Sequence, residues 1–124
     1  MKLHLQAAVG RHRLQSYDAR GFVVNGNYHS GGTLLGLRDP IHPWGPERPE
    51  DLHVDHFQLL REDPPEILLL GTGSRQRLLL ALLSQLRSQG LTVEMMDTPA
   101  ACRTYTILLS EDRRVAAALL PAGW

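Results

Sequence analysis

A glycine-rich turn, Gly71-Thr72-Gly73, and the nearby Arg75 come closest in this sequence to the pattern of a phosphate site. Glycines after a buried strand let backbone N–H groups approach an anion at the start of a helix. The dinucleotide pattern G-x-G-x-x-G is incomplete, because Gln76 stands where the third glycine belongs. The sequence also lacks the Gly-Lys-Thr or Gly-Lys-Ser of a P-loop. We therefore favour an architectural turn between a strand and a helix.

Arg75 and Arg77 are expected in the first turn of that helix, where the macrodipole disfavours cations by about 0.3 to 1 kcal/mol each. Two explanations stay open. Either Glu94 or Asp97 offsets the cost, or the arginines help to hold an exogenous anion.

A second polar segment, residues 97–104, follows the next expected strand. The carboxyl ends of parallel strands meet at one edge of a sheet, so this segment and residues 71–75 are expected to converge there. The resulting candidate pocket or anion site comprises Gly71, Thr72, Gly73, Arg75, Asp97, Thr98, Cys102, Arg103 and Thr104.

Cys102 is the only cysteine, which excludes an intrachain disulfide. It is expected early in a helix, where the dipole can lower a thiol pKa. It also shares an apolar arc with Tyr105 and Leu109, so a buried structural thiol is favoured over a nucleophile.

Other reactive side chains lack the partners that chemistry would need. His53 and His56 have a spacing that often arises by chance, so we expect no metal site. Ser74 lacks the G-x-S-x-G context of a serine hydrolase. We assign no catalytic residue and no cofactor, and we favour a role without enzymatic activity.

The elements that position the candidate residues follow from periodicity and capping signals. Residues 67–70 form an apolar run typical of a buried strand, and residues 75–89 place leucines along one helical face. Gly90 is a natural helix end, and Thr98-Pro99 suits the N-cap and first position of a second helix. We expect strands at 67–70, 91–96 and 115–120, and helices at 75–89 and 99–110.

The N-terminal half reads mainly as β structure. Asn25-Gly26 supplies the positive φ angles of a two-residue hairpin turn. Four prolines make residues 39–49 a strap on the domain, with Trp44 as its anchor and as a candidate interaction residue. Asp55 is expected to cap a short helix. The predicted segments are strands at 3–9, 14–17 and 33–37, a hairpin at 21–29 and a helix at 52–61.

The bulk properties describe an ordinary globular chain. Its 124 residues are expected to form one domain, 1–124, and 13 basic and 13 acidic residues leave no net charge to attract nucleic acid. No apolar run approaches the roughly 18 residues that a membrane-spanning helix requires. The predicted location is the cytoplasm, without nucleic-acid partners.

Several segments together resemble a small family of Mth938-like α/β domains, which includes mitochondrial complex I assembly factor 3 and an adipogenesis-associated protein. The likeness rests on residues 66–73, 93–98, 100–105 and 113–119, and extends to Pro43-Trp44 and the 21–32 strands. Thr106 replaces an expected Asn, and Asp112 stands where Glu-Gly-Arg is usual.

The resemblance implies a three-layer β/β/α domain with a mixed central sheet, helices on one face and N-terminal β structure on the other. It also implies an interaction or assembly role through one or more protein partners, with no established enzymatic activity. The alternative is a small-molecule or anion-binding protein, or an enzyme, with its site between Gly71–Arg75 and Asp97–Thr104.

Overall fold

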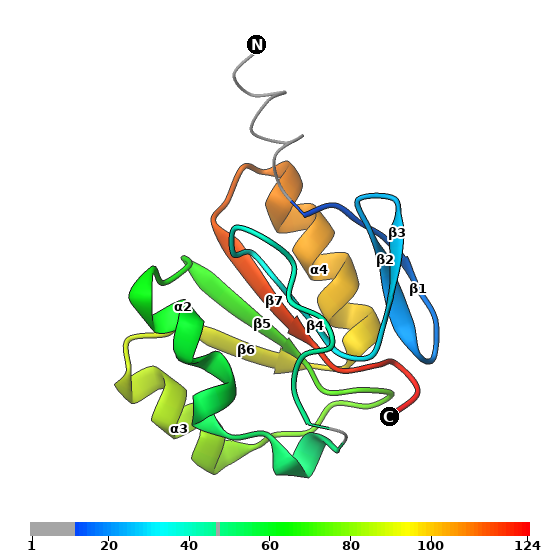
Figure 1. The fold of residues 1–124 in the computed structure, drawn as a ribbon. Helices are drawn as coiled ribbons and strands as arrows, with labels where there is room; N and C mark the ends of the chain where they lie inside the picture. The colour runs from blue at the N-terminus through cyan, green and yellow to red at the C-terminus, as the bar shows by residue number, and fades with distance from the viewer. Residues whose placement is uncertain (1–11, 47) are drawn as a thin grey trace.

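The computed structural model describes residues 12–46 and 48–124, so the strand predicted at 3–9 lies outside the described residues. Figure 1 shows two sheets with helices packed around the larger one. The elements, in chain order, are β1 (Leu14–Tyr17), β2 (Gly21–Val24), β3 (Asn27–Ser30), β4 (Thr33–Leu35), η1 (Pro49–Asp51), η2 (Val54–Phe57), α2 (Gln58–Glu62), β5 (Ile67–Gly71), α3 (Leu80–Ser88), β6 (Val93–Met96), α4 (Thr98–Ser110) and β7 (Val115–Leu119).

The central sheet is mixed, as predicted, with the strand order β4-β7-β5-β6. Strand β5 runs parallel to both neighbours and pairs Leu69 with Glu94 of β6 and Ala117 of β7, whereas β4 is antiparallel to β7. Leu68 and Leu70 belong to one core cluster and Leu69 to the other. The apolar run of β5 is therefore buried on both faces, which is why it does not alternate with polar residues.

Helices cover both faces of this sheet, which corrects the expectation that they lie on one face only. Helices α2 and α3 pack with the cluster that holds Leu68, while α4 shares the opposite face with β2 (Figure 1). The reason is the strand order. The chain moves outward from β5 to β6 and then back past β5 to β7, and right-handed crossovers in opposite directions place their helices on opposite faces.

The N-terminal sheet contains the predicted hairpin. Its strand order is β1-β2-β3, and Val24 pairs with Asn27 across the turn. Asn25 and Gly26 have φ angles of 50° and 84°, the left-handed backbone that a type I′ turn requires. Phe22 and Val24 point from β2 into the cluster beneath α4. The small sheet thus packs into the core cluster that α4 shares with the central sheet.

The strap is anchored by Trp44, whose side chain is 7% exposed. Its indole N–H donates to the carbonyl oxygen of His56 at 2.9 Å, and its ring meets Phe57 edge-on. The anchor prediction agrees with this burial. The expectation that Trp44 forms an interaction surface disagrees with it, because these contacts hold the indole inside the core.

The helix predicted from Arg75 begins only at Leu80. Before it, the Thr72 hydroxyl donates to the carbonyl oxygen of Arg75 and accepts from the N–H of Arg77, and the Gln76 amide donates to the Met95 carbonyl. These bonds hold residues 74–79 in an irregular path. The expected conflict between two arginines and a helix dipole therefore does not arise.

The second long helix ends at Ser110, as predicted, but its N-cap is Asp97 and not Thr98. The Asp97 carboxylate accepts from the N–H of Ala100 at 2.7 Å, because the Thr98 hydroxyl is already used in bonds to other segments. At the helix end Asp112 adopts a φ of 60°, so the turn accommodates Asp in left-handed backbone.

The N-cap of η2 also differs from the prediction, because His53, and not Asp55, caps it.

Candidate functional site

The two segments predicted to converge do meet at the carboxyl edge of β5 and β6. The Thr98 hydroxyl lies at their centre: it accepts from the N–H of Gly73 at 2.9 Å and donates to the carbonyl oxygen of Leu120 at 2.7 Å. The N–H of Thr98 donates in turn to the carbonyl oxygen of Gly73 at 2.8 Å. Three loops are thus joined by one buried threonine.

The backbone donors that a phosphate would need at this junction are used by the chain itself. The N–H groups of Thr72 and Gly73 donate to the Met96 carbonyl and the Thr98 hydroxyl. A Cβ atom on Gly71 would come within 3.0 Å of the Thr98 hydroxyl oxygen, so this glycine is required by close packing. The junction is a closed structural joint and gives no support to the small-molecule alternative.

The two arginines near this joint have different surroundings. Arg75 is exposed and has no ion pair with any described residue. Arg77 is half-buried, and its guanidinium donates to the carbonyl oxygens of Thr72 and Trp124. Neither of the carboxylates considered from sequence, Glu94 and Asp97, forms an ion pair with them. Arg77 therefore fastens residues 72–78 to residue 124.

Among the remaining candidate residues, only Cys102 and Arg103 line a common hollow, and it lies beside β1 and not at the strand-end junction. Asp97 serves as a helix cap, Arg103 is exposed and Thr104 is half-buried. Cys102 is 5% exposed, and burial raises the pKa of its thiol to about 12, with a smaller opposing effect from Arg103. Desolvation outweighs any stabilisation of a thiolate by the helix dipole, so Cys102 is a buried thiol and not an activated nucleophile.

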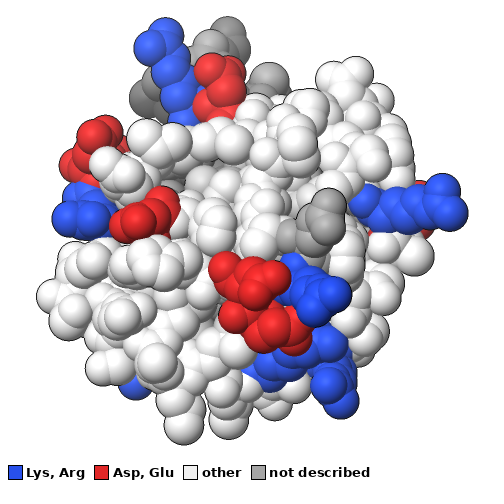
Figure 2. All heavy atoms as spheres, turned by 60° about the horizontal axis from the view of Figure 1, so that its bottom comes forward, with Lys and Arg blue, Asp and Glu red and all other residues white. Residues whose placement is uncertain are grey.

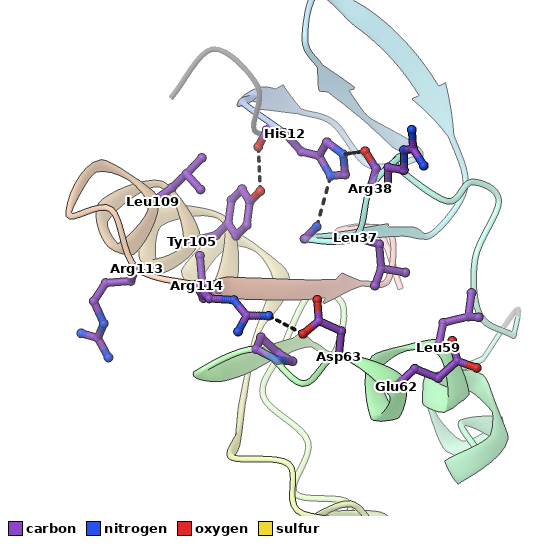
Figure 3. A pocket seen from close by; sticks show the side chains of 13 residues that line it. His12, Leu37, Arg38, Leu59, Glu62, Asp63, Tyr105, Leu109, Arg113 and Arg114 are labelled. Carbon is purple, nitrogen blue, oxygen red and sulfur yellow. Dashed lines mark hydrogen bonds and ion pairs between the residues drawn. The ribbon is translucent and has the colours of Figure 1, made fainter. Parts of the chain in front are cut away.

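A large hollow, about 720 Å³, lies at the opposite end of the central sheet. It opens where Pro65 precedes β5 and where Val115 begins β7. Figure 3 shows Tyr105 and Leu109 of α4 along one side and Leu37, Leu59 and the end of α2 along the other. Its walls combine apolar surface with charged groups.

His12 is the buried polar residue of this hollow, with 5% of its surface exposed. The N–H of Gly36 donates to its Nδ1 at 3.1 Å, and its Nε2 lies 3.2 Å from the carbonyl oxygen of Arg38. This pattern fits the tautomer that carries its proton on Nε2. The Tyr105 hydroxyl donates to the backbone carbonyl of His12 at 2.7 Å, so β1, β4 and α4 are joined here (Figure 3).

Sequence reasoning missed this histidine. His12 lies in a polar stretch with little periodicity, and its three partners are far away along the chain. No local pattern marks such a residue. Only the positions of Gly36, Arg38 and Tyr105 in space give the imidazole its role.

Two ion pairs close the rim of the hollow near α2 and β7. Arg114 donates to Asp63 at 2.8 Å, and Arg113 donates to Glu66 at 3.0 Å. The backbone N–H of Arg114 and the Arg113 side chain lower the pKa of the Glu66 carboxyl. These groups are substantially exposed, so their ion pairs orient the rim more than they stabilise the fold. The hollow therefore combines apolar side chains and the buried His12 with a charged border.

The family profile described as "Protein of unknown function (DUF498/DUF598)" matches residues 14–120, which include every described strand and helix. The chain belongs to this family. The resemblance found in the sequence is thereby confirmed.

Two vertebrate relatives of this chain carry the name of a complex I assembly factor. The chain is 41% identical over 111 residues to NADH dehydrogenase (ubiquinone) 1 alpha subcomplex assembly factor 3 of Danio rerio, and 40% identical over 111 residues to the protein of that name from Homo sapiens. The matches cover 87% of this chain in both cases, but only 63% and 60% of the two relatives. The chain therefore spans less than two thirds of their length.

Solved structures share the fold. A crystal structure of a Bordetella parapertussis protein is 38% identical in sequence and superposes with a TM-score of 0.79. The match covers 90% of this chain and 97% of the Bordetella chain. A Bordetella pertussis solution structure, described as a Mth938-like domain, is 33% identical with a TM-score of 0.76, and the match covers 94% of this chain and 88% of that one. The α/β fold class predicted from sequence is confirmed. Across residues 12–46 and 48–124, no helix is long and apolar enough to traverse a bilayer.

Proposed function

We propose that this DUF498/DUF598 chain is an assembly-type domain that acts through a protein partner in building respiratory complex I. The observation that carries the proposal is the 41% identity over 111 residues to a protein named as a complex I assembly factor. Identity at that level extends through the whole described fold and not through one motif. The role is therefore attached to the domain's surfaces, because the sequence-predicted strand-end site is filled by the chain's own hydrogen bonds.

The hollow beside α4 is the surface that we assign to the partner. Leu59, 49% exposed, and the half-buried Leu37 and Leu109 give it apolar area, while the Arg114–Asp63 ion pair supplies a polar rim. An apolar centre inside a polar border is the usual anatomy of a protein contact. A partner side chain entering the hollow would bury Leu59 beside a rim on which Arg114 and Asp63 are already paired.

The test is deletion of the gene in the source cell, followed by native electrophoresis and activity measurement of complex I. We expect loss or reduction of the assembled complex, restored by the wild-type chain. Normal complex I in the deletion strain contradicts the assembly role. Capture of the tagged chain from the same cells identifies the partner, and cell fractionation checks the predicted cytoplasmic location.

A pair of matched variants then separates the hollow from the rest of the surface. Leu59→Asp places a charge on the wall of the hollow, whereas Ile107→Asp changes an aliphatic residue on α4, 57% exposed, that does not line it. We expect failure to restore the complex with Leu59→Asp and restoration with Ile107→Asp, at equal folded protein levels. Equal restoration by both variants removes the hollow from the proposal while leaving the assembly role intact.

A further inference from the structure

A long stretch around α3 carries positive charge without any negative charge. Between Glu66 and Glu94 the sequence contains three arginines, Arg75, Arg77 and Arg87, and no Asp or Glu. Arg75 and Arg87 are exposed, and neither has an ion pair with a described residue. The stretch itself contributes positive charge and no negative charge to a chain whose formal net charge is zero.

The same stretch exposes two large aliphatic side chains. Leu78 is 63% exposed and Leu80 is 68% exposed, the two highest values among the exposed large hydrophobic residues of the described chain. Their orientation is set by the fold, because Leu82 and Leu86 point inward from α3 and the half-buried Leu79 packs on the same core. Rotation of α3 therefore cannot bury Leu80 without exposing Leu82 and Leu86, and Leu78 precedes the helix.

An aromatic residue is held beside this segment. Arg77, next to Leu78 in the chain, donates to the carbonyl oxygen of Trp124 at 2.8 Å, and Trp124 is 41% exposed. A Cβ atom on Gly73 would lie 2.9 Å from the Trp124 backbone, so residue 124 packs directly on the turn. We call Arg75, Leu78, Leu80, Arg87 and Trp124 the leucine–arginine face.

The face lies on one side of the molecule. In Figure 1 residues 73–79, α3 and residue 124 all run along the lower edge, the side that Figure 2 turns toward the viewer. Figure 2 shows mostly uncharged surface, with acidic and basic side chains that adjoin in a cluster below the centre of the view. The segment η1, Pro49–Asp51, lies along the same edge in Figure 1, and its two acidic residues, Glu50 and Asp51, oppose the arginines.

We propose that the leucine–arginine face is a peripheral contact with an anionic lipid surface. Exposed leucines flanked by arginines suit the boundary between headgroups and acyl chains, and tryptophan favours the same depth. Arg75 and Arg87 meet lipid phosphates, Leu78 and Leu80 enter the boundary, and Trp124 lies at headgroup level. This inference concerns a different surface from the hollow and does not depend on the assembly role.

The test is co-sedimentation of the purified chain with vesicles of phosphatidylcholine, with and without phosphatidylglycerol. We expect binding to the anionic vesicles at low ionic strength, much weaker binding to pure phosphatidylcholine, and loss of binding as salt screens the arginines. No binding to anionic vesicles at low ionic strength overturns the proposal. Binding that is equal on the two vesicle types overturns it as well.

Variants assign the binding to this face. Arg75→Gln and Arg87→Gln should each weaken binding about fivefold, the factor that corresponds to about 1 kcal/mol for one basic residue near an anionic surface. Leu78→Ser combined with Leu80→Ser should weaken it further. Ile107→Ser changes an exposed aliphatic residue outside the face and should leave binding unchanged.

A variant that removes negative charge, and not positive charge, provides the last control. Glu50→Gln combined with Asp51→Asn removes negative charge from the same side and should strengthen binding to anionic vesicles. All variants change residues on the surface, so circular dichroism should report a native fold for each. Equal binding by the wild type and the leucine variant, with the fold intact, overturns the assignment.

Discussion

The hydroxyl of Tyr105 donates a 2.7 Å hydrogen bond to the backbone carbonyl oxygen of His12, a residue 93 positions earlier in the chain. Tyr105 is 1% exposed and His12 is 5% exposed, so the bond is shielded from water. It ties the start of the N-terminal sheet to the middle of α4 beside the hollow. The bond therefore connects the proposed partner surface to the core.

Replacement of Tyr105 by Phe should lower the free energy of unfolding by about 1 to 3 kcal/mol, because it leaves a buried carbonyl without this donor. Urea denaturation followed by tryptophan fluorescence measures the loss. Tyr28→Phe is the matched control, since its hydroxyl bonds to Asp18 at the exposed surface. A loss no larger than that of the control would show that the bond to His12 contributes little.

Replacement of Thr98 by Val should also destabilise the fold by about 1 to 3 kcal/mol, because the Gly73 N–H and the Leu120 carbonyl both lose their hydroxyl partner. Thr98→Ser keeps the hydroxyl and should cost less. Chemical denaturation of both variants makes the comparison. If Val and Ser are equally destabilising, the two hydrogen bonds that Val removes contribute no more than the methyl group that Ser removes.

The Cys102 thiol should react slowly with iodoacetamide at neutral pH. Burial raises its pKa to about 12, which reduces the thiolate fraction on the order of a thousandfold relative to an ordinary thiol. Mass spectrometry of the folded chain, with a sample unfolded in urea as the reference, measures the difference. Labelling of the folded chain at the rate of the unfolded one contradicts a buried, protonated Cys102.

Acid should weaken the fold through a histidine pair that joins β3 to the strap. His29 and His42 stack with ring centroids 3.7 Å apart, and burial together with the neighbouring His42 lowers the pKa of His29. Below the ordinary histidine pKa of about 6.5 the unfolded chain binds more protons at this site than the folded chain. The stabilisation is complete above that pH and is lost as pH falls through the lowered value.

Unfolding measured between about pH 7.5 and pH 5 should show a smaller loss of stability for His29→Gln than for the wild type. His53→Gln, at an exposed histidine, should keep the wild-type pH dependence. The reverse ranking of the two variants would place the acid sensitivity elsewhere.

The sequence by itself determined the elements whose cause is local. Three features each depend on a few adjacent residues: the apolar run of β5, the Asn25-Gly26 turn and the end of α3 before Gly90. Their physical causes are burial, positive φ and the missing side chain of glycine. The likeness to the Mth938-like family was also carried by residues within short segments. These features could be predicted because the physical reason for each lies within a few positions of the chain.

The tertiary structure alone decided where α3 begins, what Thr98 does and where a hollow opens. Thr72 and Gln76 form hydrogen bonds that hold residues 74–79 out of the helix, and the Thr98 hydroxyl joins Gly73 to Leu120 in place of capping α4. Sequence placed a candidate site at this edge, but folding filled it with the chain's own donors and acceptors. His12 became part of another site because partners distant in sequence meet it in space, and such long-range pairing leaves no local pattern to read.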